Sequence, residues 1–201
     1  MTAPGVPSQR AAWSRKLIHL STAALPVTWA YGIVDATQVR VLLAGALGVA
    51  LGVEWGRWFS PAFRARFDAL AGPLLKPHEA LAITGATWLA LAMLVAVVVF
   101  PEPAARAALW AGAIGDSAAA LVGQAWQARA GRARSEKSLV GSAACAVGTA
   151  LGAAWLGGAT LLVATSIGLV AAMAEWPRRL GDDNLRVTLV AGGAAWLLGV
   201  G

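Results

Sequence analysis

The chain has 201 residues, of which 58% are hydrophobic and 13% are charged. A soluble domain of this length carries roughly twice that share of charge, so the composition argues against an ordinary soluble fold. The formal net charge of +6 would suit a nucleic-acid-binding protein, but the sequence has no aromatic-interleaved basic patch and no nucleic-acid-binding module. Long apolar runs instead predict an all-α bundle of transmembrane helices in one integral-membrane domain over 1–201.

We expect about seven transmembrane helices, with six as the alternative because the last two are short. In chain order they cover 17–34, 39–56, 79–100, 104–124, 138–156, 159–176 and 185–200. The short links 35–38, 101–103 and 157–158 would lie on one side of the membrane, and the long links 57–78, 125–137 and 177–184 on the other. The first apolar run has no clear small-residue cleavage site, so we interpret it as a retained span.

The basic residues indicate the orientation of this bundle. Of the 16 Lys and Arg residues, all but Arg40 and Arg106 fall on the side of the long links. Because cytoplasmic loops carry the excess of Lys and Arg, the N-terminus and the long links are expected in the cytoplasm. The sequence therefore predicts a multi-pass protein of the inner (plasma) membrane.

Two of the long links have a character of their own. In 57–78, the apolar residues recur at a helical spacing, which predicts an amphipathic helix on the cytoplasmic surface. These residues are Phe59, Phe63, Phe67, Leu70 and Leu74. The link 125–137 is a basic cytoplasmic loop that contains Arg129, Arg132 and Arg134.

Asp116 is the clearest functional candidate, because an ionisable group inside a membrane segment is costly and is kept mainly for function. Its neighbours on the same helical face, Ala119, Ala120 and Gly123, are all small. That face leaves room for water, a cation or a second helix. A structural, hydrogen-bonding aspartate is the alternative. Small residues at four-residue spacing, among them Gly48, Gly52 and Gly115, predict close helix packing.

The segment that opens the helix 138–156 is suited to phosphate. Lys137 brings a positive charge, and Ser138 and Ser142 bring hydroxyls. A helix N-terminus adds unpaired N–H groups and the positive end of the helix dipole. Ser138 is equally explained as an ordinary helix N-cap. The segment is not a Walker A loop, because the glycine-rich lead before the lysine is missing.

Further polar residues fall at the same predicted membrane face. Lys76, His78 and Glu79 precede the third helix, although proline and an acidic residue there are also plain helix-start signals. His19 is the other histidine, and neither histidine has a partner at zinc-binding spacing. Oxygen ligands suit Mg²⁺. The candidate oxygen ligands on this face are Glu54, Asp116, Glu175, Asp182, Asp183 and Asn184. Asp182–Asn184 also fits a cap for the last helix.

Taken in order, these motifs resemble the dolichol kinase, phytol kinase and CTP-dependent diacylglycerol kinase family. The matching segments are Arg15–His19, Glu54 with Arg57, Lys76–Glu79 with Thr84–Thr87, Gly115–Ala119, Lys137–Ser142, and Glu175 with Asp183–Asn184. The resemblance implies transfer of the γ-phosphate of CTP to the hydroxyl of a lipid alcohol, with Mg²⁺ or another divalent cation. It also implies a site at the cytoplasmic face.

The resemblance also implies roles for individual residues. Asp116 and Asp183 would hold Mg²⁺ or orient phosphate, with Asn184 and Glu54 as further metal ligands. Lys76, Lys137, Ser138, Gly141 and Ser142 would contact the nucleotide, with His78 and Glu79 in the same pocket. The general base would be Glu175 or Glu79. Lys16, His19, Arg57 and Thr84 belong to matching motifs, and Arg129, Arg132 and Arg134 would compensate for a basic residue missing after Gly123.

Two alternatives remain open from the sequence. A CTP:phosphatidate cytidylyltransferase is similar in the Asp116 and Lys137 segments, but its long C-terminal signature is missing here. A small transporter would also contain buried carboxylates, although transport sites usually lie at the midplane between internal repeats. The acceptor is open among polyprenol, phytol, farnesol and diacylglycerol, and a homodimer is compatible with the sequence.

Overall fold

The computed structural model describes residues 9–75, 77–131, 137–176 and 182–201. Every element in these ranges is helical, which confirms the all-α prediction. The helices are α1 (Gln9–Ser21), α2 (Ala24–Ala30), α3 (Ala36–Phe59), α4 (Pro61–Ala71), α5 (Gly85–Val99), α6 (Glu102–Trp110), α7 (Asp116–Arg129), α8 (Leu139–Trp155), α9 (Leu161–Glu175) and α10 (Asp183–Leu197). Two 3₁₀ turns, η1 (Gly72–Leu74) and η2 (Pro77–Ala80), and a π-helical turn, η3 (Ala111–Gly115), complete the list.

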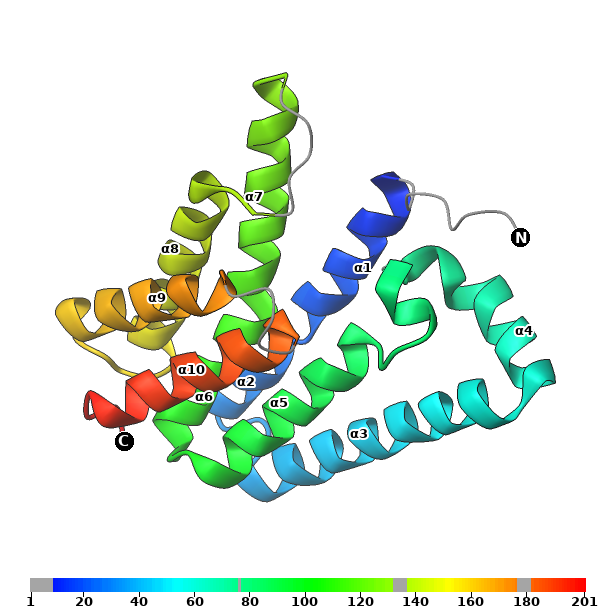
Figure 1. Cartoon of the computed structure of the whole chain (residues 1–201). Coiled ribbons are helices and arrows are strands. Elements are labelled where there is room, and N and C mark those ends of the chain that lie inside the picture. The colour runs from blue at the N-terminus through cyan, green and yellow to red at the C-terminus, as the bar shows by residue number, and fades with distance from the viewer. Residues whose placement is uncertain (1–8, 76, 132–136, 177–181) are drawn as a thin grey trace.

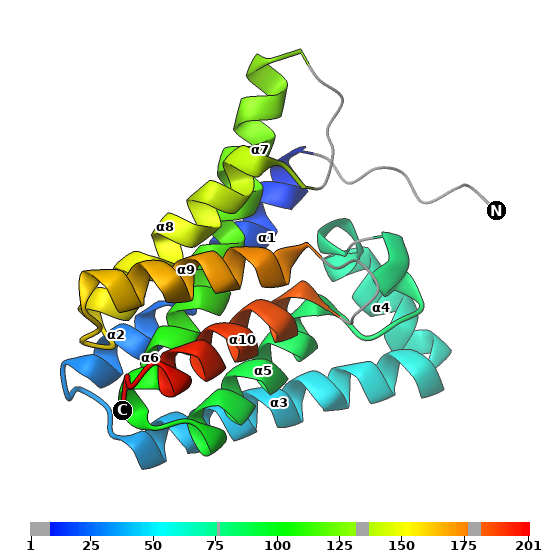
Figure 2. The same ribbon diagram turned by 60° about the vertical axis from the view of Figure 1, so that its left-hand side comes forward.

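Neighbouring long helices run antiparallel and form a bundle (Figures 1 and 2). In the α3–α5 pair, Arg40 Nε donates to the Val97 carbonyl at 3.2 Å near one end, and Thr84 N donates to Glu54 Oε1 at 2.8 Å near the other. In the α6–α8 pair, Arg106 Nε donates to the Leu156 carbonyl at 3.0 Å. These contacts place Arg40 and Arg106 together with the short links, at the end opposite the candidate site.

The predicted first helix, 17–34, is divided into α1 and α2. The chain turns at Thr22 and Ala23, four and three residues before Pro26. A proline has no N–H to donate, and its ring clashes with the carbonyl four residues earlier, so a helix through Thr22 is interrupted. The Thr22 hydroxyl donates to the His19 carbonyl at 2.6 Å and helps to close α1.

The α3 helix begins three residues before the predicted start at 39. Asp35 and Gln38 form a reciprocal capping box, in which Asp35 Oδ1 accepts from Gln38 N at 2.8 Å and Gln38 Oε1 accepts from Asp35 N at 2.9 Å. The box satisfies backbone donors that have no partner inside the helix. What we expected to be a tight turn is therefore largely the first turn of α3.

The predicted helix 104–124 is extended at both ends and distorted in its middle. Helical structure is continuous from Glu102 to Arg129 through α6, η3 and α7, so 125–129 is helix and not loop. The π-helical turn η3 places Gly112 against the Thr188 hydroxyl and Gly115 against the Thr149 hydroxyl. A Cβ at either glycine would collide with that hydroxyl, so missing side chains permit this close approach.

Small-residue packing is confirmed around Gly115, but Gly48 and Gly52 differ from the prediction. Within the described chain, no atom lies within 4 Å of where their Cβ atoms would be. The bundle core is instead made of small and aliphatic side chains from α6 to α10 and, in a second cluster, from α2, α3, α5 and α6. Buried residues of these clusters include Ala107, Ala153, Ile167 and Val187 in the first, and Trp29, Leu43, Met93 and Leu109 in the second.

Of the helices described, α3 is the one both long and apolar enough to cross a membrane, at 24 residues and a mean hydropathy of 1.6. Only 11% of its most apolar window is buried within the chain. The apolar helices α5, α8 and α9 are shorter, at 15, 17 and 15 residues. Large apolar side chains stay exposed on these helices, among them Val49, Leu151, Leu161 and Leu162.

Candidate functional site

Four chain segments bring charged residues to one end of the bundle. Asp116 opens α7 directly after the π-helical turn, Lys137 precedes α8, Glu175 closes α9 and Asp183 opens α10. Because α8, α9 and α10 pack as successive antiparallel neighbours, the start of α8, the end of α9 and the start of α10 meet at the same end (Figure 2). We call these four residues the charged cluster.

Asp116 is buried and ion-paired. Its Oδ2 lies 2.6 Å from Lys16 Nζ, and the two side chains are only 7% and 10% exposed. This contact joins residues 100 positions apart and docks α1 against α7. Ser117, next to Asp116, is also completely buried.

Lys137 connects α8 to both α9 and α10. Its Nζ donates to the Glu175 backbone carbonyl at 2.5 Å, and it lies 3.6 Å from Glu175 Oε1 and 3.8 Å from Asp183 Oδ2. Glu175 interacts electrostatically with Asp116 and Asp183 as well as with Lys137. Three carboxylates from three helices therefore share one neighbourhood, and such a group of like charges requires cations.

Ser138 and Ser142 have different local roles. Ser138 Oγ accepts from Gly141 N at 3.0 Å, which makes Ser138 the N-cap of α8. Gly141 lies against the Ala119 carbonyl, where a side chain would not fit, so α7 and α8 approach closely here. Ser142 Oγ donates to Glu175 Oε2 at 3.4 Å and accepts from Trp176 Nε1 at 2.9 Å. Ser142 is thus the serine that joins the charged cluster.

Asn184 holds a buried acceptor next to this cluster. The residue is 2% exposed, and its Nδ2 donates to Asp182 Oδ1 at 2.8 Å and to the Gly85 carbonyl at 3.2 Å. Its Oδ1 is buried and has no hydrogen-bond partner. Asp182 Oδ1 also accepts from Asn184 N at 3.0 Å, as expected for a cap of α10.

The packing of α10 against α6 and η3 fixes where its first turn lies. Thr188 lies against Gly112, and Gly192, one turn further along α10, lies against Ala108. These contacts show that α10 runs antiparallel to α6 and η3. The first turn of α10, which contains Asn184, therefore lies toward the end of η3 that precedes Asp116.

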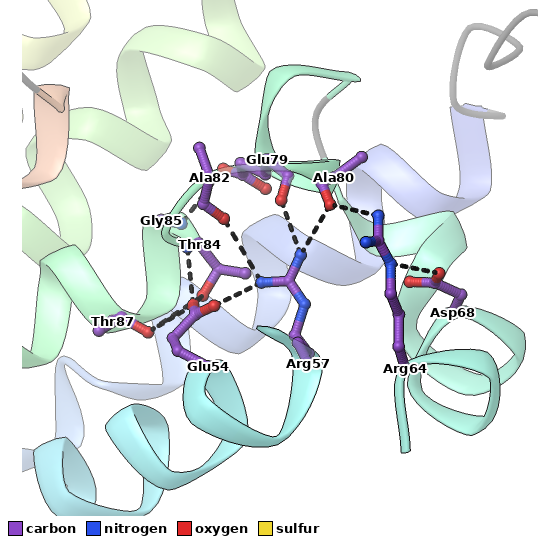
Figure 3. Close-up of polar contacts among 10 residues, drawn as sticks. All are labelled: Glu54, Arg57, Arg64, Asp68, Glu79, Ala80, Ala82, Thr84, Gly85 and Thr87. Carbon is purple, nitrogen blue, oxygen red and sulfur yellow. Dashed lines mark hydrogen bonds and ion pairs between the residues drawn. The ribbon is translucent and has the colours of Figure 1, made fainter. Parts of the chain in front are cut away.

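Glu54 and Arg57 form a second cluster, shown in Figure 3. Glu54 Oε1 accepts from Thr84 N and Thr84 Oγ1, both at 2.8 Å, and from Thr87 Oγ1 at 3.0 Å. Glu54 Oε2 lies 2.5 Å from Arg57 Nη1. The carboxylate is saturated by donors of the protein itself. These contacts give Glu54 a structural role, and its role as a metal ligand stays a prediction.

Arg57 binds the segment before α5, where the third predicted helix starts later than expected. Its guanidinium donates to three carbonyls of the segment before α5: that of Glu79 at 2.8 Å, and those of Ala80 and Ala82 at 3.4 Å (Figure 3). The Glu79 carbonyl also accepts from Ala82 N at 3.4 Å. The segment 81–84 is irregular, and α5 begins at Gly85. Glu79, 3% exposed, accepts from Gly85 N at 3.2 Å through Oε1.

No family model, curated protein or solved structure matches this chain. The geometry and the sequence motifs therefore carry the functional argument.

The remaining predicted site residues lie in several places. Lys76, Arg132 and Arg134 are outside the described residues, and so is the side chain of His78. Arg129 is exposed at the end of α7, beside the exposed Trp126. His19 is buried on α1, one turn after Lys16, and Thr84 belongs to the Glu54 cluster.

The oxygen atoms of Asp116, Asp183 and Asn184 are suitable ligands for a Mg²⁺ ion that arrives with a nucleotide. Among the described residues, no three His, Cys, Asp or Glu side chains gather to hold a metal by themselves. Mg²⁺ that arrives with a nucleotide usually needs only one or two carboxylates, because waters and phosphate oxygens fill its other positions. The Asn184 Oδ1, buried without a partner, and the adjacent Asp183 carboxylate have the right chemistry. Asp116 interacts electrostatically with Glu175, as Asp183 does.

Sequence reasoning missed two contributors to this end of the bundle. Arg186 Nε donates to the Ala174 carbonyl at 3.0 Å, so a second cation lies beside Glu175. Trp176 donates its indole N–H to Ser142. Trp176 directly follows Glu175, and Arg186 lies two residues after Asn184. Helical periodicity around those segments was the available signal.

Proposed function

We propose that the protein is an integral-membrane kinase that transfers the γ-phosphate of CTP to the hydroxyl of a lipid alcohol. The observation that carries this proposal is the charged cluster, in which Asp116, Lys137, Glu175 and Asp183 meet from four separate segments. Phosphoryl transfer needs little beyond positioned cations, a metal site and an orienting carboxylate. The ordered motifs of the sequence supply CTP and the lipid alcohol.

The membrane part of the proposal is supported by the exposed apolar surface. The α3 helix is 24 residues long and almost unburied in its apolar window. The chain contains seven successive helical units, namely α1–α2, α3, α5, α6–α7, α8, α9 and α10. Their alternating directions agree with seven spans whose long links, and with them the charged cluster, face the cytoplasm.

The chain's own residues would divide the reaction as follows. Lys137 and the N-terminal turn of α8, which contains Ser142, would bind the nucleotide phosphates. Asp183 and Asn184 Oδ1, with Asp116, would hold the Mg²⁺ that the nucleotide brings, and this ion would offset phosphate charge. We assign Glu175 as the general base, because it belongs to the charged cluster whereas Glu79 is bound to the backbone of Gly85.

In this reaction the lipid oxygen bonds to the γ-phosphorus as Glu175 accepts the hydroxyl proton. The bond from that phosphorus to the β,γ-bridging oxygen breaks, and CDP leaves with the bond's electron pair. A general base must come within hydrogen-bond reach of the proton it accepts. Glu175 sits at the end of α9, where a lipid hydroxyl at the membrane boundary would arrive.

The proposal is tested by incubating the protein in nanodiscs with γ-labelled CTP, Mg²⁺ and a panel of polyprenol, phytol, farnesol and diacylglycerol. We expect labelled phospholipid with at least one acceptor, and loss of transfer in Lys137→Met. The matched control is Arg66→Met, which removes one positive charge from the exposed surface of α4. Absence of transfer to every acceptor, or equal activity in Lys137→Met and Arg66→Met, would contradict the proposal.

A further inference from the structure

Trp176 is an exposed aromatic residue fixed to the charged cluster. It follows Glu175 at the end of α9 and is 49% exposed. Its Nε1 donates to Ser142 Oγ at 2.9 Å, and the same hydroxyl donates to Glu175 Oε2 at 3.4 Å. One edge of the indole is therefore anchored to α8, while about half of the residue stays accessible.

The cation of the cluster binds the backbone next to Trp176. Lys137 Nζ donates to the Glu175 carbonyl, which belongs to the peptide unit that joins Glu175 to Trp176. Arg186 Nη2 reaches the same carbonyl at 3.4 Å. Two cations thus bind the carbonyl of the peptide unit that joins Glu175 to Trp176, and Trp176 itself is about half exposed. Nucleotide sites combine such features, a positive charge for phosphate and a flat ring for the base.

We propose that Trp176 is the stacking platform for the nucleobase of a nucleotide whose phosphates bind at Lys137. This inference rests on the proposed function and adds to it a subsite for the base. Stacking on an aromatic side chain is tolerant of base identity, because every base has a π-face. Trp176 therefore contributes affinity for nucleotides in general, and other groups select cytosine.

A lipid-facing indole is the competing role for an exposed tryptophan near a membrane boundary. The position of Trp176 favours the nucleotide. Its N–H is bound to a hydroxyl of the charged cluster, and its neighbour in the chain is the ion-paired Glu175. Charged groups at this point would keep acyl chains away from the ring, because burying them in hydrocarbon is costly.

The test compares two probes, one that carries a nucleobase and one that does not. Binding of a non-transferable CTP analogue, with a methylene group between the β- and γ-phosphorus atoms, is measured beside inorganic tripolyphosphate. The variants are Trp176→Ala and Trp176→Phe, in nanodiscs with Mg²⁺. Trp196→Ala is the matched control, because Trp196 is 50% exposed and lies near the opposite end of α10.

We expect Trp176→Ala to weaken binding of the CTP analogue about 5- to 150-fold and to leave tripolyphosphate binding unchanged. Trp176→Phe should retain most of the affinity, and Trp196→Ala all of it. Unchanged CTP-analogue binding in Trp176→Ala would overturn the inference and favour a lipid-facing ring. Equal losses for both probes would also overturn it, because they indicate a role only through Ser142. If the unaltered protein binds neither probe, the proposed function itself fails.

Discussion

The ion pair between Lys16 and Asp116 leads to the sharpest stability prediction. With side chains 10% and 7% exposed and 2.6 Å between the charges, the pair is buried. Removing one partner of such a pair costs about 3–5 kcal/mol, since the other charge keeps its desolvation cost, whereas replacing both partners is often close to neutral. We therefore expect Asp116→Asn to lose about 3–5 kcal/mol of unfolding free energy, and Lys16→Met/Asp116→Asn to lose far less.

The assay is denaturant unfolding in one detergent for the wild type, both single variants and the double variant. The difference between the double variant and the sum of the single variants gives the coupling energy of the pair. Additive losses would refute the reasoning, because they would mean that Lys16 and Asp116 do not stabilise one another. The double variant also separates fold from chemistry. It should be folded and still unable to transfer phosphate, since the Asp116 carboxylate is gone.

Three further predictions follow from the packing. Gly168→Ala should cost about 1–3 kcal/mol, because its Cβ would collide with the Ala146 backbone carbonyl, whereas Gly48→Ala meets nothing within 4 Å and should cost no stability in the same unfolding assay. Arg57→Met should speed hydrogen exchange between residues 79 and 85, because three carbonyls lose their donor; unchanged exchange there would contradict the positioning role. Cys145, completely buried, should resist a maleimide until the protein is denatured, and rapid labelling of native protein would contradict the α7–α8 packing.

Periodicity and composition located most helices well. Apolar runs fixed the cores of α3, α8, α9 and α10 to within a few residues of their observed bounds. The boundaries that shifted were set by individual side chains. Asp35 extends α3 backward by a capping box, and Pro26 divides the first predicted helix. Pro26 was visible in the sequence, and its effect on Thr22 was predictable in principle.

The late start of α5 could not be predicted from the local sequence. Pro77 and Glu79 look like ordinary helix-start residues, and a helix from 79 was the natural expectation. In the structure the Glu79 carbonyl accepts instead from Arg57, 22 residues earlier, and 81–84 is irregular. Such a contact depends on how α3 and α5 pack, and no periodicity encodes it. The same holds for the π-helical turn, which depends on Thr149 and Thr188 fitting against Gly115 and Gly112.

The candidate site was predictable in its members more than in its contacts. Asp116, Lys137, Glu175 and Asp183 were each expected at one end of the bundle, and the structure brings them together there. The partner of Asp116 was not expected, because Lys16 is 100 residues away. Glu54 was expected among them, yet it is saturated by Thr84, Thr87 and Arg57. The end of the bundle at which a carboxylate lies can be predicted from the topology. Its ion-pair and hydrogen-bond partners depend on side-chain packing.

The central claim is that the γ-phosphate of CTP moves to a lipid hydroxyl. The most direct measurement gives the protein, in nanodiscs with the lipid acceptor that it prefers, either γ-labelled or α-labelled CTP, and then counts label in the extracted lipid. We expect label in lipid from γ-labelled CTP alone, with CDP as the other product. Label that enters lipid from α-labelled CTP, with release of pyrophosphate, would contradict the kinase reaction and identify a cytidylyltransferase.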